Sequence, residues 1–396
     1  MAKMTIRDLE LKGKRVLIRV DFNVPLTDGL EVSDDTRIRA ALPTINYALE
    51  NSAKVILMSH LGRPKGEVLD SLRLNPVRDR LSELLGQEVK KVDSCIGKDA
   101  REAVDELRDG EVLLLENVRF YKEETANDPE FAKELSLLGD IFINDAFGSS
   151  HRAHASVVGV ADYLPAAAGF LLMKEIEYFE KILRDPEHPF YAILGGAKVS
   201  DKIEVIKNLL NVADKILIAG GMAYTFLKAR GVEVGLSKLE EDKIELAGEL
   251  MTLAENKGKK IVLPLDHIVV EEIKDGAKVE EVGLEIPEGK IAIDIGKETR
   301  ELFKQELKDA KTVVWNGPLG IFEIEAFSYG TREIAEFLAE VEAIKVIGGG
   351  DTAACIEKMD IVDSFSHIST GGGASLEYLE GKVLPGIAVL KEREDG

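Results

Sequence analysis

The hydrophobic residues of the first half of the chain fall in short runs, each followed by a polar turn and then by a segment of helical period. These runs cover residues 16–20, 55–58, 112–115 and 141–143. Runs this apolar are typical of strands buried on both faces. The second half repeats the pattern at 191–194, 216–219, 261–263, 312–315 and 344–347. Alternating strands and helices predict an α/β fold with two parallel sheets, each flanked by helices in a three-layer arrangement.

A helix is indicated between the two halves. Apolar side chains recur there at i, i+4, i+7 and i+11, at Leu172, Ile176, Phe179 and Leu183, and Asp185-Pro186 ends the pattern. The chain of 396 residues exceeds the roughly 250 to 300 residues beyond which single cores stop growing. We therefore expect an interdomain helix over 171–185, although a helix inside one large domain would give the same pattern.

The composition narrows the classes of partner and compartment. The chain has 72 acidic and 51 basic residues and a formal charge of -21, which disfavours binding to nucleic acid or to an anionic membrane. The first residues are charged and lack the apolar core of a signal peptide, and we expect a cytoplasmic protein. Cys95 and Cys355 lie far apart and outside any CxxC pattern, so both are expected to be reduced core residues.

Polar and basic residues follow the strands of the first half. Ligands of open α/β sheets bind at the carboxyl ends of the strands, where this half places Asp21, Asn23, His60, Arg63, Arg119 and Arg152, with Arg37 nearby. Arginine forks suit phosphate or carboxylate oxygens, and Asp21 and Asn23 suit a hydroxyl. This set predicts a small, multiply anionic, hydroxylated ligand.

Each of these residues also has a structural interpretation. Any single arginine in so acidic a chain can pair with a neighbouring carboxylate, and a hydrogen-bonded structural role accounts for His60 as well as ligand binding does. His151 and His154 are spaced for a metal, but no third ligand follows at a matching distance, and we interpret them as structural residues or as residues that support the ligand contacts from behind.

The strands of the second half are followed mostly by glycine. These turns contain Gly195-Gly196, Gly220-Gly221, Asn316-Gly317, Gly348-Gly349-Gly350 and Gly371-Gly372-Gly373. A glycine turn that opens a helix favours a bound phosphate, whereas a single Gly-Gly pair is more often only a tight turn. Lys198 and Lys202, at i and i+4, are expected on one face of the helix after the first turn, with a phosphate between them. For either lysine alone, a solvated surface position is the alternative.

Two acidic residues of this half are candidate ligand contacts. Asp351, after three glycines, is the candidate Mg²⁺ ligand, with a helix cap as the alternative for Asp351 or for Thr352. Glu323 could accept from ribose hydroxyls, and an exposed structural role explains it equally well. The GxxxxGK[ST] loop, the GxGxxG fingerprint after the first strand and protein-kinase signatures are missing from the sequence.

The ordered motifs closely resemble phosphoglycerate kinase of the bacterial type over the whole chain. They begin with the segment 15–25 (RVLIRVDFNVP) and continue with 59–64 (SHLGRP), 116–120 (ENVRF), 144–148 (NDAFG), 151–154 (HRAH), 195–199 (GGAKV), 315–318 (WNGP), 349–352 (GGDT) and 370–374 (TGGGA). The resemblance implies a monomer of two Rossmann-like domains joined by a hinge. It also implies reversible transfer of the acyl phosphate of 1,3-bisphosphoglycerate to Mg-ADP.

The resemblance also implies a role for each candidate residue. The 3-phosphoglycerate site would comprise Asp21, Asn23, Arg37, His60, Arg63, Arg119 and Arg152. The ATP/ADP site would comprise Lys198, Lys202, Gly220, Gly221, Asn316, Glu323, Gly349, Gly350, Asp351 and Thr352, with Asp351 on Mg²⁺. Residues 384–390 resemble a tail that returns to the first domain, which gives domains of 1–170 plus 380–396 and of 186–379.

Catalysis is expected to depend on Arg37, Lys198 and Lys202, with Arg37 and Lys198 meeting over the transferred group when the hinge closes. Ala219 and Lys297 depart from the family pattern near the expected adenosine. Two other functions remain open: a non-catalytic protein that closes on a phosphorylated metabolite, which the glycine-rich turns disfavour, and a dinucleotide oxidoreductase, which the missing GxGxxG disfavours.

Overall fold

The chain forms two compact units. The computed structural model describes residues 3–393, and contacts divide the chain into a first unit, residues 1–177 with 383–396, and a second unit, residues 178–382. The change of unit falls after Glu177, inside helix α6 (Phe170–Arg184). The sequence predicted an interdomain helix over 171–185 and a second domain that ends at 379, and the contact boundaries fall inside that helix and after residue 382.

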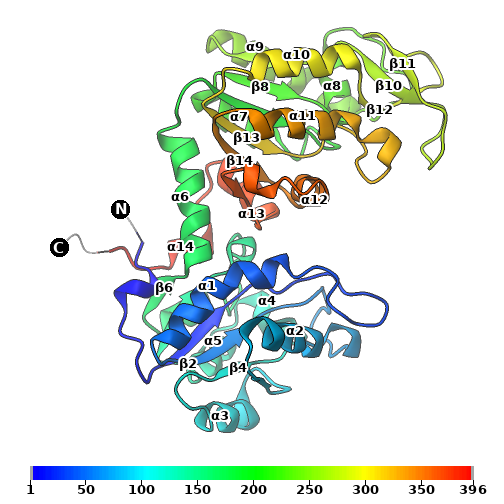
Figure 1. The fold of residues 1–396 in the computed structure, drawn as a ribbon. Helices are drawn as coiled ribbons and strands as arrows, with labels where there is room; N and C mark the ends of the chain where they lie inside the picture. Colours follow the sequence, from blue (N-terminus) through cyan, green and yellow to red (C-terminus); the bar gives the residue numbers. More distant parts are fainter. Residues whose placement is uncertain (1–2, 394–396) are drawn as a thin grey trace. The chain divides into compact units, whose positions relative to one another are not determined.

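The first unit is built on a six-stranded parallel sheet of order β3-β4-β2-β1-β5-β6, of which strands β2, β4 and β6 are labelled in Figure 1. Its strands are β1 (Arg15–Arg19), β2 (Lys54–Met58), β3 (Val89–Lys91), β4 (Val112–Leu114), β5 (Ile141–Asn144) and β6 (Ala166–Ala168). Its helices are α1 (Thr36–Glu50), α2 (Asn75–Leu85), α3 (Gly97–Asp105), α4 (Lys122–Ala126), α5 (Pro129–Ser136) and α14 (Pro385–Ala388). Because all strands are parallel, all their carboxyl ends lie at one edge of the sheet.

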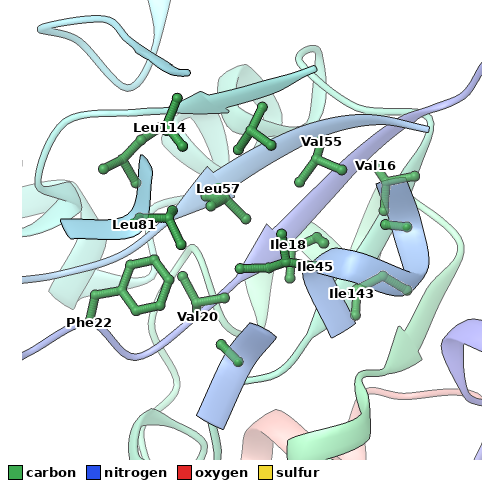
Figure 2. Packing of buried hydrophobic residues seen from close by; sticks show 14 of the residues in the cluster. Val16, Ile18, Val20, Phe22, Ile45, Val55, Leu57, Leu81, Leu114 and Ile143 are labelled. Carbon is green, nitrogen blue, oxygen red and sulfur yellow. The ribbon is translucent and has the colours of Figure 1, made fainter. Parts of the chain in front are cut away.

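Alternate residues of the strands fill the core on one face of this sheet. Val16, Ile18 and Val20 pack with Val55 and Leu57 in one cluster of buried side chains (Figure 2). The intervening residues, such as Leu17 and Ile56, are also fully buried. Both faces of the sheet are therefore covered, which is why the strands read as continuous apolar runs.

The C-terminal residues complete the first unit. Gly386 accepts a hydrogen bond from Asn144 Nδ2 at 2.9 Å and donates its N–H to the Ser150 carbonyl at 2.9 Å. Lys3 and Glu392 form an antiparallel bridge. The segment around Gly386 thus packs beside the end of β5, one of the strands that lead into candidate site residues.

The second unit contains a second six-stranded parallel sheet, of order β15-β14-β13-β7-β8-β9. Its strands are β7 (Phe190–Leu194), β8 (Lys215–Ile218), β9 (Lys260–Val262), β13 (Thr312–Asn316), β14 (Ile344–Gly348) and β15 (His367–Ile368). Its helices are α7 (Ile203–Val212), α8 (Met222–Ala229), α9 (Ile244–Asn256), α10 (Lys297–Leu307), α11 (Tyr329–Glu340), α12 (Gly350–Lys358) and α13 (Gly373–Leu379). The predicted α/β class with two parallel sheets is confirmed.

An antiparallel sheet of order β11-β10-β12 was not predicted. It consists of β10 (His267–Val270), β11 (Glu280–Val282) and β12 (Ile291–Ile295). Strand β11 is largely exposed and lacks the apolar run that marked the parallel strands. Strands β3, β6 and β15 were missed as well. Strand β3 contains a single apolar residue, β15 spans two residues, and β6 consists of three alanines, a residue depleted in strands.

Two further observations concern the cysteines and the length of the helices. Cys95 and Cys355 are both buried and free of disulfide bonds, as expected of core residues. None of the helices within residues 3–393 is both long and apolar enough to cross a membrane.

Candidate active site

The candidate anion site of the first unit lies where β1, β2, β4 and β5 end. Arg37, in the first turn of α1, forms an ion pair with Asp21, with 3.2 Å between Nη1 and Oδ1. His60, directly after β2, has its Nδ1 atom 4.0 Å from the same carboxylate oxygen. The structure therefore brings Asp21, Arg37 and His60 together, although they are separated by up to 39 residues in the sequence.

A glycine joins two further predicted residues. The Gly62 N–H donates to Asn23 Oδ1 at 2.8 Å, and the Gly62 carbonyl accepts from Arg119 Nη1 at 2.9 Å. Gly62 has a φ of 62°, a left-handed conformation that glycine adopts without strain. Asn23 and Arg119 are thus tied to the N–H and to the carbonyl of one glycine in the loop after β2.

Arg63 and Arg152 are the exposed members of the predicted set. Arg63 follows Gly62 on the same loop. Burial, as the largest cause, and the charge of Arg19 lower the pKa of Arg119 to about 10, and the charge of Arg152 acts in the same direction. Like charges held this close favour a shared anionic ligand, because such a ligand removes their repulsion.

Behind this cluster lies a buried network that the sequence did not reveal. Arg19, the last residue of β1, is fully buried, and its Nε donates to Ser156 Oγ at 2.8 Å. Ser156 Oγ donates in turn to Glu124 Oε1 at 2.6 Å, and Glu124 is also fully buried. The only signal for Arg19 was a charged residue inside an apolar run, and Glu124 and Ser156 gave none.

The charges around the cluster keep Asp21 ionised and the histidines neutral. Burial raises the pKa of Asp21, but His60, Arg37 and Arg19, which face the carboxylate, and the hydrogen bond from the Asn23 N–H hold that pKa below its ordinary value. Burial, assisted by the charge of Arg119, lowers the pKa of His154 to about 4. His154 lies beside Glu124, with Nδ1 3.7 Å from Oε1. The site therefore gathers cationic arginines around the carboxylate of Asp21, with the carboxylate of Glu124 behind them.

The post-strand turns of the second unit pack against one another. Gly195 and Gly196 donate to the carbonyls of Asn316 and Pro318, both at 3.0 Å, and Gly220 donates to the Leu319 carbonyl at 3.1 Å. A methyl group on Gly195 would overlap the Pro318 carbonyl. Glycine is required at Gly195 by this close packing of backbone on backbone, without reference to a ligand.

Open space lies instead at the start of α12. A methyl group on Gly350 would meet no atom within 4 Å, and Gly349 precedes it with a φ of 93°. The side chains at this end of the helix provide no cap. Its first N–H groups are therefore available to an anion.

Lys198 and Lys202 do not share a helix face as predicted. Helix α7 begins only at Ile203, and Lys202 is the residue before it. The preceding segment is held in turns because Glu240 accepts from the Ser200 N–H at 3.1 Å and from Ser200 Oγ at 2.6 Å. Lys202 is buried and donates to Asn316 Oδ1, whereas Lys198 is exposed.

Asn316 is the polar centre of this half of the site. Its side-chain oxygen accepts from Lys202, but its buried Nδ2 has no hydrogen-bond partner within the described chain. Gly349 lies against this amide: a methyl group there would sit 3.4 Å from Nδ2. An unpartnered buried donor beside a cation suits an anionic oxygen.

The remaining predicted residues frame this centre. Thr352 is buried, and its Oγ1 accepts from the Gly317 N–H at 2.9 Å, so it ties α12 to the turn after β13. Gly221 lies directly before α8, and a methyl group on it would be 3.0 Å from the Ala197 carbonyl. Glu323 is exposed on the loop between β13 and α11.

Asp351 is exposed in the first turn of α12, and its charge acts on Lys202, whose pKa burial lowers to about 8. Residues 3–393 contain no group of three or more His, Cys, Asp or Glu side chains that could hold a metal ion. A single exposed carboxylate fits a Mg²⁺ ion that takes its other ligands from nucleotide phosphates and water. The donor set therefore fits Mg²⁺ carried by a nucleotide and does not fit a metal held by protein alone.

Comparisons with known proteins place the chain among relatives of one kind. The family model described as phosphoglycerate kinase matches residues 6–382. The chain is 58% identical to the phosphoglycerate kinase of Dictyoglomus turgidum over 398 residues, covering 99% of this chain and 100% of the relative. It is 57% identical to that of Moorella thermoacetica over 394 residues, with the same coverage.

Solved structures agree with the sequence relatives. The phosphoglycerate kinase of Coxiella burnetii matches with a TM-score of 0.88 at 40% identity. That of Pyrococcus horikoshii matches with a TM-score of 0.87 at 36% identity. In both comparisons the alignment covers 98% of this chain and 98% of the other.

Proposed function

Because the chain belongs to the phosphoglycerate kinase family, we propose that it transfers the acyl phosphate of 1,3-bisphosphoglycerate to Mg-ADP, reversibly, giving 3-phosphoglycerate and Mg-ATP. The observation that carries this proposal is the pairing of two different sites on two parallel sheets. One is an arginine-rich cluster around the Asp21 carboxylate, and the other is a glycine-lined helix start beside a buried lysine. A small acidic sugar derivative and a nucleotide are the ligands that this pair suits.

In this proposal the first unit binds 3-phosphoglycerate. Arg63, Arg119 and Arg152 supply forked donors for the phosphate and carboxylate oxygens. Asp21 and Asn23 accept from or donate to the hydroxyl group, and Arg37 and His60 complete the site. The Arg37–Asp21 ion pair supports this arrangement, because it holds the guanidinium at the carboxyl end of the sheet before substrate arrives.

The second unit binds the nucleotide. Lys202 and Asn316 Nδ2 are placed to meet phosphate oxygens, and the free N–H groups at Gly349 and Gly350 add donors. Gly220 and Gly221 form the turn beside Gly196, and Glu323 is proposed to accept from the ribose. Asp351 would hold Mg²⁺, which when bound neutralises part of the charge on the phosphates.

Phosphoryl transfer asks little covalent chemistry of the protein. The carboxylate of 3-phosphoglycerate is itself an anionic nucleophile, so no general base is needed, and Asp21 acts in binding. Arg37, Lys198 and Lys202 are the proposed catalytic residues, since cationic donors stabilise the charge on the transferred oxygens. We also propose that the enzyme works as a monomer in the cytoplasm and that α6 acts as its hinge.

The proposal is tested by a coupled assay with 3-phosphoglycerate, Mg-ATP and a reagent that traps acyl phosphates. We expect ADP release that depends on 3-phosphoglycerate and that is strongly reduced in Lys198→Ala. ADP release no higher than that of Lys198→Ala would refute the kinase function. Turnover with a nicotinamide cofactor, or ligand binding without turnover, would favour the two other functions.

The role of Arg37 is tested against a neighbour on the same helix. Arg39 lies two residues later, is exposed and pairs with Asp35 at 2.8 Å. An arginine over the transferred group can be worth about 10³ to 10⁵ in rate, so Arg37→Ala should lower kcat far more than it weakens nucleotide binding. Arg39→Ala should leave kcat unchanged, and a near-normal kcat in Arg37→Ala would remove Arg37 from the catalytic set.

A further inference from the structure

The Nδ1 atom of His60 lies beside a buried arginine and a carboxylate. The ring is only 4% exposed, and its Nδ1 atom lies 3.1 Å from Arg19 Nη2 and 4.0 Å from Asp21 Oδ1. A separation of 3.1 Å is a hydrogen bond, whereas 4.0 Å is too long for one. Nδ1 therefore bonds to Arg19 and not to Asp21.

The direction of this hydrogen bond follows from the chemistry of its partners. A guanidinium has five N–H donors, no acceptor, and a proton that it does not lose in proteins. Nδ1 must then be the acceptor, through its lone pair. A neutral imidazole carries one proton, so that proton sits on Nε2.

Arg19 is fixed in the position that imposes this tautomer. Its Nε donates to Ser156 Oγ at 2.8 Å, and its Nη1 donates to the Val20 carbonyl. The Ser156 hydroxyl cannot turn its proton towards Arg19, because it donates to Glu124 Oε1 at 2.6 Å. The whole guanidinium is fully buried, so water cannot replace these partners.

We propose that Arg19 is a positioning residue that holds His60 in the neutral form with its proton on Nε2, so that His60 offers the substrate one N–H donor and no charge. This rests on the proposed function insofar as the substrate is the anionic 3-phosphoglycerate. Arg19 acts through His60 and is not assigned a contact with substrate. The role differs from those of Arg63, Arg119 and Arg152, which supply charge as well as donors.

The groups facing His60 agree with a neutral ring over the physiological range. Burial lowers the pKa of His60 well below its ordinary value, and the charges of Arg19, Arg119 and Arg37 act in the same direction. Asp21 alone acts in the opposite direction. The hydrogen bond from His60 to substrate should therefore be independent of pH between about 5 and 8.

The tautomer can be measured on the ligand-free protein. The full chain is labelled with ¹⁵N at its six histidines. Long-range ¹H–¹⁵N spectra are recorded between about pH 5 and pH 8, and the spectrum of His60→Gln identifies the His60 signals by their loss. We expect an unprotonated Nδ1 and a protonated Nε2 throughout. A proton on Nδ1, or titration of the ring within this range, would overturn the proposal.

A substitution of Arg19 adds the functional consequence. Arg19→Met removes the donors, and Arg15→Met is the matched control, because Arg15 lies on the same strand and pairs with Asp140 at 2.7 Å. In Arg19→Met we expect the Nδ1-protonated form to appear. We also expect the KM for 3-phosphoglycerate to rise about 10- to 100-fold with a smaller change in kcat, as for the loss of one hydrogen bond to a charged group.

The readouts separate this inference from the proposed function. A raised KM with an unchanged His60 tautomer would mean that Arg19 acts by its charge alone, and the positioning role would be wrong. If Arg19→Met does not fold, the wild-type spectra still test which nitrogen of His60 carries the proton. If the spectra are as expected but no kinase turnover is found, only the proposed function falls.

Discussion

Asp294, on strand β12, is a buried carboxylate whose ionisation should weaken the folded second unit. It is 1% exposed, and its Oδ2 accepts from the Gly330 N–H at 2.7 Å and its Oδ1 from the Ile295 N–H at 2.9 Å. Burial raises its pKa from 3.8 to about 7, against the smaller effect of these hydrogen bonds. The folded protein therefore keeps a proton that the unfolded chain loses between about pH 4 and pH 7.

The sign and size of the effect follow from this shift. A carboxyl group with a raised pKa contributes stability that is fully present below about pH 4 and is lost as the pH rises through about 7. One pKa unit corresponds to about 1.4 kcal/mol, so a shift of about three units corresponds to about 4 kcal/mol. Asp294→Asn removes the titration, so its stability relative to wild type should rise by up to about 4 kcal/mol across that range.

The substitution also has a cost that does not depend on pH. An amide can replace only one of the two acceptor oxygens, so the Gly330 or Ile295 N–H loses its partner at a cost of about 1 to 3 kcal/mol. This cost shifts the plot of the stability difference against pH by a constant and leaves its slope unchanged. The prediction is therefore the slope of the difference between variant and wild type.

Trp315 provides the assay. It is the single tryptophan of the chain, it is fully buried on β13 in the second unit, and its Nε1 donates to the Gly317 carbonyl at 2.8 Å. Urea unfolding followed by its fluorescence, at about pH 4.5, 5.5, 6.5 and 7.5, gives the free energy of unfolding of wild type and variant. Asp275→Asn, at an exposed site in the same unit, is the control and should give a flat difference. A flat difference for Asp294→Asn as well would refute the reasoning.

Three further predictions concern single contacts. Burial lowers the pKa of Lys202 to about 8, and Lys202 should bind nucleotide phosphate only when protonated. Calorimetry should therefore show that the affinity for Mg-ADP falls about tenfold per pH unit above about pH 8. Lys202→Met should show no such fall. Gly169→Ala should reduce the free energy of unfolding, measured by circular dichroism, by about 1 to 3 kcal/mol. Its methyl group would overlap the Asp145 carboxylate, which accepts from the Leu172 N–H at 3.2 Å. The control Gly248→Ala, in open space within α9, should not destabilise the protein. Asp351→Asn should raise the Mg²⁺ concentration for half-maximal activity by on the order of tenfold or more, whereas the exposed Asp363→Asn should leave it unchanged; an equal effect of both would argue against Asp351 as the metal ligand.

The sequence was sufficient for the architecture because parallel sheets leave a strong local signal. Strands β1, β2, β7, β8 and β13 are buried on both faces, and each was found within one residue or so of its observed ends. The resemblance to phosphoglycerate kinase is confirmed by the family model and by relatives at 57% and 58% identity. What the strand pattern could not reveal was the antiparallel sheet, whose strand β11 is mostly exposed.

For the candidate site, the sequence indicated where the functional residues lie along the fold, but it did not indicate which residues they contact. Asp21, His60 and Arg119 could be expected at one edge, since each follows a parallel strand. That Lys202 turns inward while Lys198 stays exposed depends on Glu240, which holds the segment between them from about forty residues further along the chain. Arg19 and Glu124 were missed because contacts between buried residues that are distant in sequence leave no periodic trace.

The return of the chain to the first unit at Val383 sets an order for folding during synthesis. A ribosome makes residues 178–382, and with them every strand of the second unit, before the last segment of the first unit exists. Until then Asn144 Nδ2 lacks the Gly386 carbonyl, and Lys3 lacks its bridge to Glu392. The half of the protein that is translated first is therefore the half that is finished last, and the strand end that carries Asn144 and Asp145 is completed only when the chain nears its end.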